Sequence, residues 1–383
     1  MALTTVSSDR LATNVKNTNF TAAEKQDLTD DILPLAGQIG SRNLVHNGEF
    51  IVSQRNFSSS AVTQTGEAFT IDRWKTRMSA NSKFSVQQVA DAPAGFYNSA
   101  KITSLAATTV GASDYYQFQH CIEGFNLNPA DFGTATAKAL TLSFHVKSSL
   151  TGTFSVCFSN NAGDRFLAQN YTISSADTWE KKTISVPAIT TGSWNRGNTA
   201  GLFIYFTLGA GSGTLQSTGS WGTSFGRGGT GGANVVATNG ATWQITGVQL
   251  EVGSVTTDFE HRSFGQELSL CHRYYYLAHE MNGLGGEKPI NLGVAENSST
   301  ITSILRFPVT MRSVPTMEAS SGSGFFMFRE DNGSHSFNTL TLRYATKMAA
   351  EFTQSGSVSL TSAVGGMLRG ANDDATLAFT AEL

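Results

Sequence analysis

Between about residues 140 and 252 the sequence alternates apolar and polar residues in short runs. The clearest runs are LTLSFHVK (140–147), TFSVCFS (153–159), KKTISVP (181–187), GLFIYFTL (201–208) and WQITGVQLE (243–251). Successive side chains of a strand point to opposite faces, so a period of two predicts strands with one face in a core. Turn-forming segments such as SNNAGD and TNGAT separate the runs. We therefore predict a mostly β protein with a jelly-roll β-sandwich over residues 43–262.

The pattern changes after residue 262 and then returns to strands. The segment SFGQELSLCHRYYY (263–276) predicts a short helix over 265–276. The runs GFFMF (324–328), NTLTLRYA (338–345) and ATLAFTAEL (375–383) follow it. They predict a smaller C-terminal β-sandwich over residues 263–383, with the last residues tied into a sheet.

The first 42 residues differ from the rest of the chain because they are polar and poor in aromatic residues. Thr21 and Glu24 form a capping box, and Leu28, Ile32 and Leu33 give a narrow apolar stripe before Pro34. A helix of about 12 residues with so narrow a stripe is marginal alone in water. We expect it to dock on a partner; the alternative is a disordered leader with a fraying helix.

Composition and charge exclude several classes of partner. Only 14% of the 383 residues are charged and the net charge is −3, which gives no electrostatic reason to expect nucleic acid or an anionic membrane as a partner. The sequence shows no signal-peptide pattern and no apolar stretch long enough for membrane insertion. Cys121, Cys157 and Cys271 are odd in number and far apart, which predicts reduced, buried thiols in a protein made in a reducing cytoplasm.

The insertion GAGSGTLQSTGSWGTSFGRGGTGG (209–232) is too rich in glycine to build a core. It carries Trp221, Phe225 and Arg227, and Trp194 lies in a second loop, TTGSWNRGN. No Gly-Lys-Ser/Thr follows GRGGTGG, so it does not match a phosphate-binding loop. Aromatic rings on a loop can stack on sugars or anchor an interface, so these four residues are candidate glycan-binding residues. Subunit contact, or a loop folded back on its own sandwich, are the alternatives.

The other three tryptophans, Trp74, Trp179 and Trp243, lie in or beside strand patterns, and we expect them in the core. Catalytic motifs are missing from the sequence. The acidic residues of the sandwich region match no paired-carboxylate spacing, and neither an H-E-x-x-H nor a G-x-S-x-G motif occurs. We therefore predict that the protein is not an enzyme.

Three pieces of the sequence together resemble the modular tail-fibre and receptor-binding proteins of tailed bacteriophages and their prophages. They are NLVHNGEFIVSQRN (43–56) with AFTIDRWK (68–75), the junction ITGVQLEVGSVTTDFEHRSFGQELSLCHRYYY (245–276), and FPVTMRSVPTM (307–317) with the terminal AEL. The resemblance covers residues 43–383, and the junction is its most specific part. It implies a jelly roll similar to carbohydrate-binding modules, followed by a distal β-sandwich knob.

The same resemblance implies a homotrimer in the virion, assembled in the host cytoplasm. Residues 1–42 would attach it to a phage tail or head protein, and its β-domains would adsorb to a host cell-surface glycan. Two alternatives remain: a capsid-decorating or cement protein, and a carbohydrate-active enzyme.

The junction is also where we expect contacts between domains or subunits. Asp258, Glu260, His261 and Arg262 can pair across such a boundary. In the fibre hypothesis, the following residues approach a shared axis and are subunit-interface candidates: Leu268, Tyr274, Tyr275 and Tyr276. The alternative is a within-chain linker that packs on its own domains.

Carbohydrate-binding jelly rolls often hold a structural calcium ion near their N-terminal strand. Asn47, Glu49 and Glu251 occupy the matching NGEF and QLE elements and are the candidate ligands. Calcium takes about six to eight oxygen ligands, so these three residues would supply only part of a site. In the knob, the loops NGLGGEKP (282–289) and REDNGSHS (329–336) are the candidates for contact with a host receptor.

Overall fold

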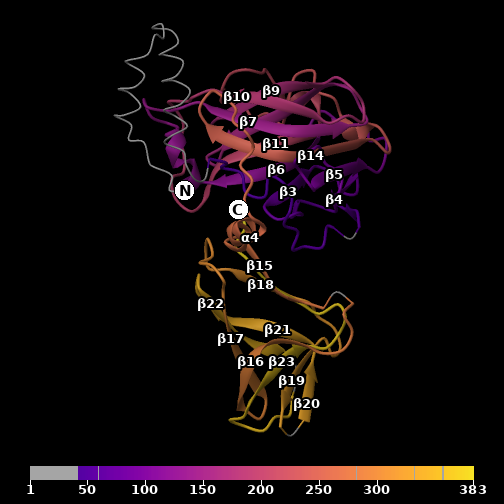
Figure 1. Ribbon diagram of the computed structural model, residues 1–383, viewed down its shortest axis with the longest axis vertical. Coiled ribbons are helices and arrows are strands. Elements are labelled where there is room, and N and C mark those ends of the chain that lie inside the picture. The colour runs from indigo at the N-terminus through magenta and orange to yellow at the C-terminus, as the bar shows by residue number, and fades with distance from the viewer. Residues whose placement is uncertain (1–41, 59, 282, 332, 356–357) are drawn as a thin grey trace, which may run out of the picture.

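The computed structural model describes residues 42–58, 60–281, 283–331, 333–355 and 358–383. Two β-sandwiches are stacked end to end, and helix α4 (Phe264–His272) lies between them (Figure 1). The larger sandwich comes first in the chain and the smaller one last. This confirms the predicted fold class of a jelly-roll β-sandwich followed by a smaller β-sandwich. The expected N-terminal helix and attachment segment lies outside the described residues, apart from Arg42.

Two six-stranded antiparallel sheets form the first sandwich. In spatial order, one sheet consists of β1 (Val62–Thr63), β4 (Phe84–Val89), β5 (Ser99–Ser104), β14 (Thr242–Val252), β7 (Leu140–Ser148) and β10 (Glu180–Val186). The other consists of β2 (Ala68–Phe69), β3 (Trp74–Met78), β6 (Tyr115–Glu123), β11 (Ala200–Ala210), β8 (Gly152–Asn160) and β9 (Phe166–Ile173). The neighbours of β14 and β11 lie far apart in sequence, as in a jelly roll.

Short elements connect these strands. A single helical turn, α3 (Gly124–Leu127), leads into η1 (Asn128–Ala130), and the loop after β11 contains η2 (Ser212–Thr214), β12 (Leu215–Gln216), β13 (Gly228–Gly229) and η3 (Val235–Ala237). β12 and β13 pair in parallel.

The second sandwich packs a three-stranded sheet against a seven-stranded one. The smaller sheet contains β15 (Tyr275–Glu280), β24 (Thr376–Thr380) and β18 (Thr316–Ala319). The larger contains β20 (Gly333–Phe337), β19 (Phe326–Glu330), β23 (Gly365–Gly370), β16 (Lys288–Asn297), β17 (Thr300–Arg306), β22 (Ala349–Ser355) and β21 (Thr339–Ala345). Phe326, Phe328, Phe352 and Phe379 are fully buried between the sheets.

The alternating runs correspond closely to observed strands. β7, β8, β10, β11 and β14 each begin and end within two residues of the runs that predicted them. The core of the first sandwich holds Trp74 and Trp243, both fully buried as expected. Trp179 departs from the prediction because it is only half-buried, with its Nε1 3.4 Å from Asp91 and Lys147 5.1 Å from its ring centroid. The three cysteines are buried free thiols, as predicted.

Helix α4 is shorter than predicted. Ser263 caps its N-terminus: its hydroxyl accepts from the Gln266 amide, and the Gln266 side chain accepts from the Ser263 amide at 3.0 Å. The helix ends at His272, so the prediction of helix through Tyr276 was wrong. Tyr275 and Tyr276 belong to β15 because their backbones pair with Thr380 and Phe379 of β24. β-Sheet pairing with the end of the chain determines this conformation, and local helical periodicity does not show it.

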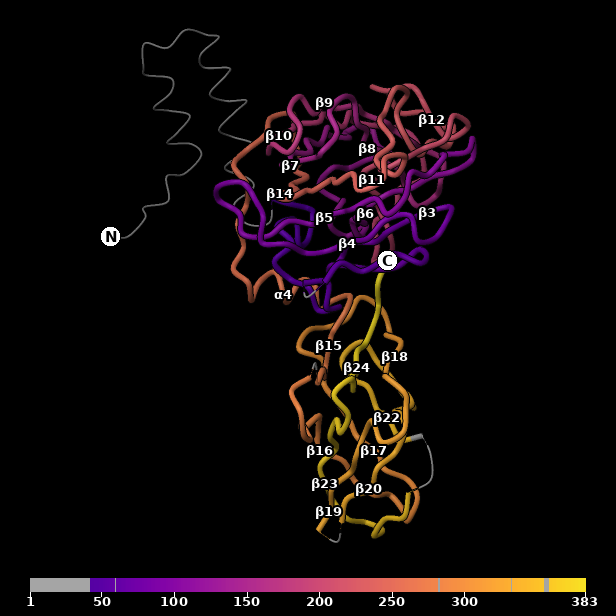
Figure 2. Tube along the Cα trace, turned by 90° about the vertical axis from the view of Figure 1, so that its right-hand side faces the viewer, coloured from indigo at the N-terminus to yellow at the C-terminus, as the bar shows by residue number. Residues whose placement is uncertain are grey.

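The end of the chain returns to the first sandwich (Figure 2). The Glu382 carboxylate accepts hydrogen bonds from Arg73 Nη1 and, at 3.1 Å, from Arg55 Nη2. The side chains of Arg73 and Glu382 are 1% and 5% exposed. Arg312 donates from Nε to the Ala381 carbonyl at 2.6 Å and from Nη1 to the Asn198 carbonyl at 3.0 Å. The chain end is therefore fixed to the first sandwich by charged groups that are largely removed from water.

A second set of contacts lies beside this one. Arg273 donates from Nε and Nη2 to the Glu123 carboxylate at 2.9 and 2.6 Å, and the Tyr274 hydroxyl donates to it at 2.5 Å. The Arg73 guanidinium carbon lies 3.5 Å from the Tyr274 ring centroid, so the two sets are in contact. We call the combined set the interdomain clasp: Arg55, Arg73, Glu123, Arg273, Tyr274, Arg312 and Glu382.

Removal of the Glu382 carboxylate tests how much the clasp stabilises the protein. Glu382→Ala leaves the Arg73 charge buried without its anion, and we expect the free energy of unfolding to fall by about 3–5 kcal/mol. Arg196→Ala is the control because it breaks the exposed Arg196–Asp131 pair of the first sandwich, and we expect a loss of under about 1 kcal/mol. Urea denaturation of both variants gives the comparison. Equal losses would contradict a stabilising role of the clasp.

Two histidines are buried next to the clasp and predict a pH dependence. His120 Nε2 lies 3.1 Å from the His46 carbonyl oxygen. Burial, assisted by the Arg73 charge, lowers the pKa of both imidazoles well below the usual value. The unfolded chain therefore binds protons at these sites at a higher pH than the folded chain, so stability is lost as the pH falls through about 6.5.

Between pH 7.5 and 6 we expect the free energy of unfolding to fall by roughly 0.5–1 kcal/mol for each of these two histidines. Urea denaturation at several pH values measures how steeply the free energy of unfolding changes with pH. His120→Gln should reduce this pH dependence by the contribution of one histidine. If the pH dependence of stability is the same in His120→Gln, the buried His120 is not one of its causes.

Candidate functional site

The outer face of the second six-stranded sheet carries aromatic side chains. Along β11, Leu202, Ile204 and Phe206 point into the core, whereas Phe203 and Tyr205 lie on the opposite face. A strand with large apolar residues on both faces is covered on both, at least in part. The cover on this outer face comes from the loop after β11.

The loop over residues 211–232 runs across the sheet edge. Backbone bridges join Phe166 to Gly222 and Ala168 to Thr218, so the loop pairs with β9. A Cβ atom on Gly229 would lie 2.3 Å from Asn170 Oδ1, which explains why glycine is needed where the loop crosses the sheet. The alternative of a loop folded back on its own sandwich therefore describes much of this insertion.

An open depression of about 300 Å³ remains between the loop and the sheet. We call it the groove. The groove is lined by Arg77, Ser159, Asn160, Asn161, Gly163, Phe166, Phe203, Tyr205, Thr223, Phe225, Gly226 and Arg227. Two of the four predicted glycan-binding residues, Phe225 and Arg227, are thus brought together in one site.

Arg227 is fixed in place in the groove. Its guanidinium carbon lies 4.2 Å from the Phe225 ring centroid and 4.4 Å from that of Tyr115. Nη1 donates to Gln117 Oε1 at 3.2 Å, and the backbone carbonyl accepts from Gln117 Nε2 and Thr207 Oγ1. Burial, and then the nearby Arg77 charge, lower the pKa of Arg227 from its usual value.

The floor of the groove offers polar groups beside aromatic ones. The Tyr205 hydroxyl lies 3.1 Å from Ser159 Oγ. Asn160 holds the adjacent turn, since its Oδ1 accepts from the amides of Asp164 and Arg165 at 3.1 Å. Phe225 remains 51% exposed and packs edge-on against Phe166. An exposed ring next to fixed hydrogen-bonding groups can stack on a sugar and also bind its hydroxyls.

The other two candidates lie outside the groove. Trp221 lines a neighbouring depression of about 440 Å³ together with Arg165, but its Nε1 donates to the Pro187 carbonyl at 2.8 Å. Trp194 packs edge-on against Trp221 and Phe132 and donates to the Thr191 carbonyl. Both indoles are half-buried and their polar atoms are occupied within the chain. The structure therefore shows both indoles packed within the chain.

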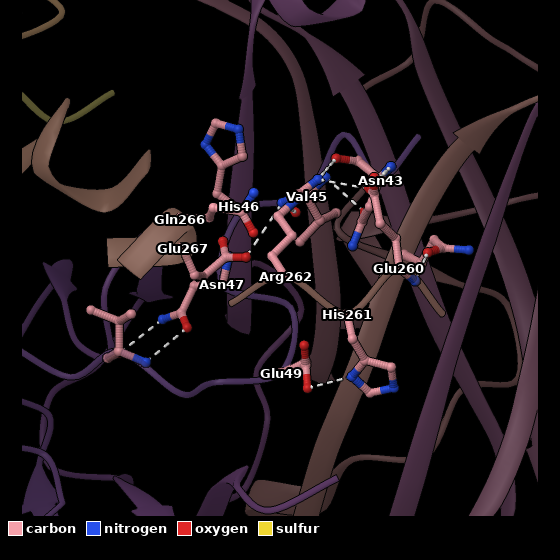
Figure 3. Close-up of polar contacts among 12 residues, drawn as sticks. Asn43, Val45, His46, Asn47, Glu49, Glu260, His261, Arg262, Gln266 and Glu267 are labelled. Carbon is pink, nitrogen blue, oxygen red and sulfur yellow. Dashed lines mark hydrogen bonds and ion pairs between the residues drawn. The ribbon is translucent and has the colours of Figure 1, made fainter. Parts of the chain in front are cut away.

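The three expected calcium ligands bind protein groups individually (Figure 3 shows Asn47 and Glu49). Asn47 Oδ1 accepts from the Val52 amide, and Glu49 lies 2.9 Å from His261 Nδ1. Glu251 accepts from the Thr257 amide and hydroxyl at 2.9 and 2.7 Å. Among the residues that the structure describes, no group of three or more His, Cys, Asp or Glu side chains is arranged to hold a metal. This arrangement does not fit a calcium site.

The junction residues instead connect the first residues of the jelly roll to helix α4. The Asn47 amide donates to the Glu267 carboxylate, and Glu260 accepts from the Asn43 amide at 2.8 Å (Figure 3). Arg262 donates to the carbonyls of Asn43 and Val45. These contacts of Glu260 and Arg262 lie within the predicted domain 43–262, and the Arg262–Glu267 ion pair at 3.4 Å is the one of this set that reaches helix α4.

Two of the four subunit-interface candidates make their contacts within this chain. Tyr274 and Tyr275 are buried in the chain itself, Tyr274 against Glu123 and Arg73, and Tyr275 under Arg55 at 3.5 Å. Leu268 and Tyr276 are half-buried, and Tyr276 packs against the core of the second sandwich. For Tyr274 and Tyr275 the within-chain alternative is correct, because their side chains are enclosed by this chain's own clasp.

Sequence reasoning missed the sheet half of the groove. Phe203 and Tyr205 lie in a strand pattern, and no motif in the sequence marks Arg77 or Ser159 as binding residues. The run GLFIYFTL (201–208) contained the signal, because aromatic residues occupy both of its alternating faces.

No protein-family model and no curated protein matches this sequence. Solved structures with a similar arrangement include the enzymatically active domain of tailspike protein 4 from bacteriophage CBA120, at 13% identity and a TM-score of 0.31, covering 55% of this chain and 21% of that one. A putative sugar-binding protein from Bacteroides thetaiotaomicron matches at 14% identity and 0.32, covering 55% and 99%. A family 11 carbohydrate-binding module from Clostridium thermocellum matches at 10% and 0.28, covering 52% and 100%.

The chain thus spans about a fifth of the length of the tailspike domain. Within the described part of the chain, no helix is long and apolar enough to cross a membrane.

Proposed function

We propose that this protein binds glycans through the groove. The observation that carries the proposal is the exposed Phe225 ring beside fixed polar groups of the sheet, in an open depression. A flat ring can stack on the face of a sugar while hydroxyl and amide groups bind its hydroxyls. The proposal is for binding without catalysis, because none of the groove's lining residues is Asp or Glu and glycosidases canonically use a pair of carboxylates.

Phe225→Ala removes the stacking ring and tests the proposal. The ring is 51% exposed, so we expect little change in stability and a loss of glycan affinity of at least about tenfold. Binding is measured by a glycan array followed by titration calorimetry with the glycan that binds best.

Tyr97→Ala is the matched control, because Tyr97 is an aromatic residue with 74% exposure that does not line the groove. Equal affinity of Phe225→Ala and the unmodified protein would place the binding site elsewhere. Release of reducing sugar from a bound polysaccharide would favour the enzyme alternative.

We also propose that the protein is a homotrimeric tail-fibre component of a tailed bacteriophage that adsorbs to a host surface glycan. The resemblance of residues 43–383 motivates this role, with residues 1–42 attaching it to a tail or head protein in the virion. A capsid-decorating protein is the alternative. These two roles differ in whether the free protein associates with itself.

One surface of the second sandwich supports self-association. The outer face of its seven-stranded sheet exposes Leu292 and Val294 of β16, Ile304 of β17 and Tyr344 of β21. Arg343 pairs with Glu296 at 2.9 Å and with Glu351 at 3.3 Å on the same face. Copies that turn such a face toward a threefold axis can pack the apolar residues together and place charges of opposite sign on neighbouring copies side by side. We assign this face to contacts between subunits.

Ile304→Lys tests the assignment. Ile304 is 61% exposed, so we expect the variant to fold but to sediment as a monomer, because a charge in an apolar interface must lose its water. Leu284→Lys, at a loop residue with 64% exposure, should remain a trimer. Analytical ultracentrifugation measures both masses.

A trimer in which Ile304→Lys has no effect would move the interface to another surface. A monomeric unmodified protein would overturn the homotrimer.

A further inference from the structure

The lining of the groove carries more positive than negative charge, and a neutral sugar has no anionic group to pair with it. Its lining contains two guanidinium groups, from Arg77 and Arg227, and no carboxylate. Both guanidinium carbons lie 5.9 Å from the Tyr205 ring centroid, so the two charges lie around the same aromatic side chain. Like charges placed together are unfavourable unless an anion lies between them.

The nearest carboxylate does not neutralise this pair. Glu67 accepts from Arg77 Nε at 3.0 Å and lies 3.4 Å from Lys75 Nζ, so its single charge is shared by two cations. Arg227 forms no ion pair with a carboxylate among the residues that the structure describes. Together, Lys75, Arg77 and Arg227 exceed Glu67 by two positive charges.

The side chain of Arg227 also lacks one of the hydrogen bonds that it could form. The residue is 8% exposed, and its Nε is buried with no acceptor in the described structure. Its stacking on Phe225 and Tyr115 offsets only part of the free-energy cost of removing this charge from water without a carboxylate partner. A side chain held rigidly in this state is preorganised for an anion from outside the chain.

From these observations we infer that the groove binds an acidic sugar residue, with its anionic group facing Arg77 and Arg227. Guanidinium groups are suited to carboxylates and sulfates because their N–H donors form a planar fork that can bind two oxygens at once. Phe225 would stack on the sugar ring while Tyr205 and Ser159 contact its hydroxyls. This inference rests on the proposed glycan-binding function and names the class of glycan.

The test uses an array of paired oligosaccharides. Each carboxylated member stands beside its methyl-esterified counterpart, and each sulfated member stands beside its desulfated one. We expect the full-length protein to bind acidic members at least about tenfold more tightly than their neutral counterparts. We also expect this preference to weaken as salt is added. The carboxylated and sulfated pairs distinguish the two sources of the anionic group.

Three variants connect the preference to the groove. Arg227→Gln and Arg77→Gln should each bring the affinity for acidic members close to that for their neutral counterparts. Arg77 lies near the surface, with 24% side-chain exposure, so Arg77→Gln gives a result even if Arg227→Gln does not fold. Arg196→Gln is the control for net charge, because Arg196 of the first sandwich has 47% side-chain exposure and does not line the groove, and it should keep the preference.

Equal binding of acidic and neutral members would overturn this inference and leave the glycan-binding function intact. A preference that all three arginine variants weaken equally would also overturn it, because net charge would then be the cause. Failure to bind any member would count against both proposals.

Discussion

The buried ion pair between Arg73 and Glu382 joins the first sandwich to the last residues of the second. Arg73 lies directly before β3 of the first sandwich, and Glu382 is the residue before the last. Removal of both charges from water is unfavourable unless each finds its partner, so the pair exists only when the two sandwiches are in contact. Arg312 and the Glu123–Arg273–Tyr274 set depend on the same contact. The charged groups of the clasp are therefore removed from water only when the two sandwiches hold this orientation relative to each other.

This constraint matters for the proposed function because the groove and the exposed sheet face lie on different sandwiches. Phe225 and Arg227 belong to the first sandwich, whereas Leu292 and Ile304 belong to the second. If copies associate through the second sandwich, the clasp determines the direction in which each groove points. Several grooves with a fixed orientation can bind a repetitive surface glycan with an avidity well above that of one site.

The sequence predicted those features that depend on local pattern. The alternating runs located β7 and β14 to within a residue because a half-buried strand imposes a period of two on its own side chains. The glycine-rich loop with its aromatic residues indicates Phe225 and Arg227 as candidates, and the structure places both in the groove. In each case the necessary information lies within about ten residues.

Features that depend on distant parts of the chain were not predicted. Arg73 and Glu382 are 309 residues apart and resemble ordinary surface charges in the sequence. Tyr275 follows a helical pattern but pairs with β24, whose position no local pattern shows. Glu49 occupies the expected element, yet its carboxylate lies 2.9 Å from His261, which is 212 residues away in the sequence. The position of a residue in the NGEF or QLE element therefore does not show whether its side chain is arranged to bind calcium.

The central claim is that the clasp joins the two sandwiches into one cooperative unit. Differential scanning calorimetry of residues 1–383 measures this directly, because it compares the calorimetric enthalpy with the van't Hoff enthalpy of the same transition. The clasp predicts a single transition with a ratio of about one. Two separate transitions, each with its own midpoint, would show that the sandwiches unfold independently and would contradict the claim.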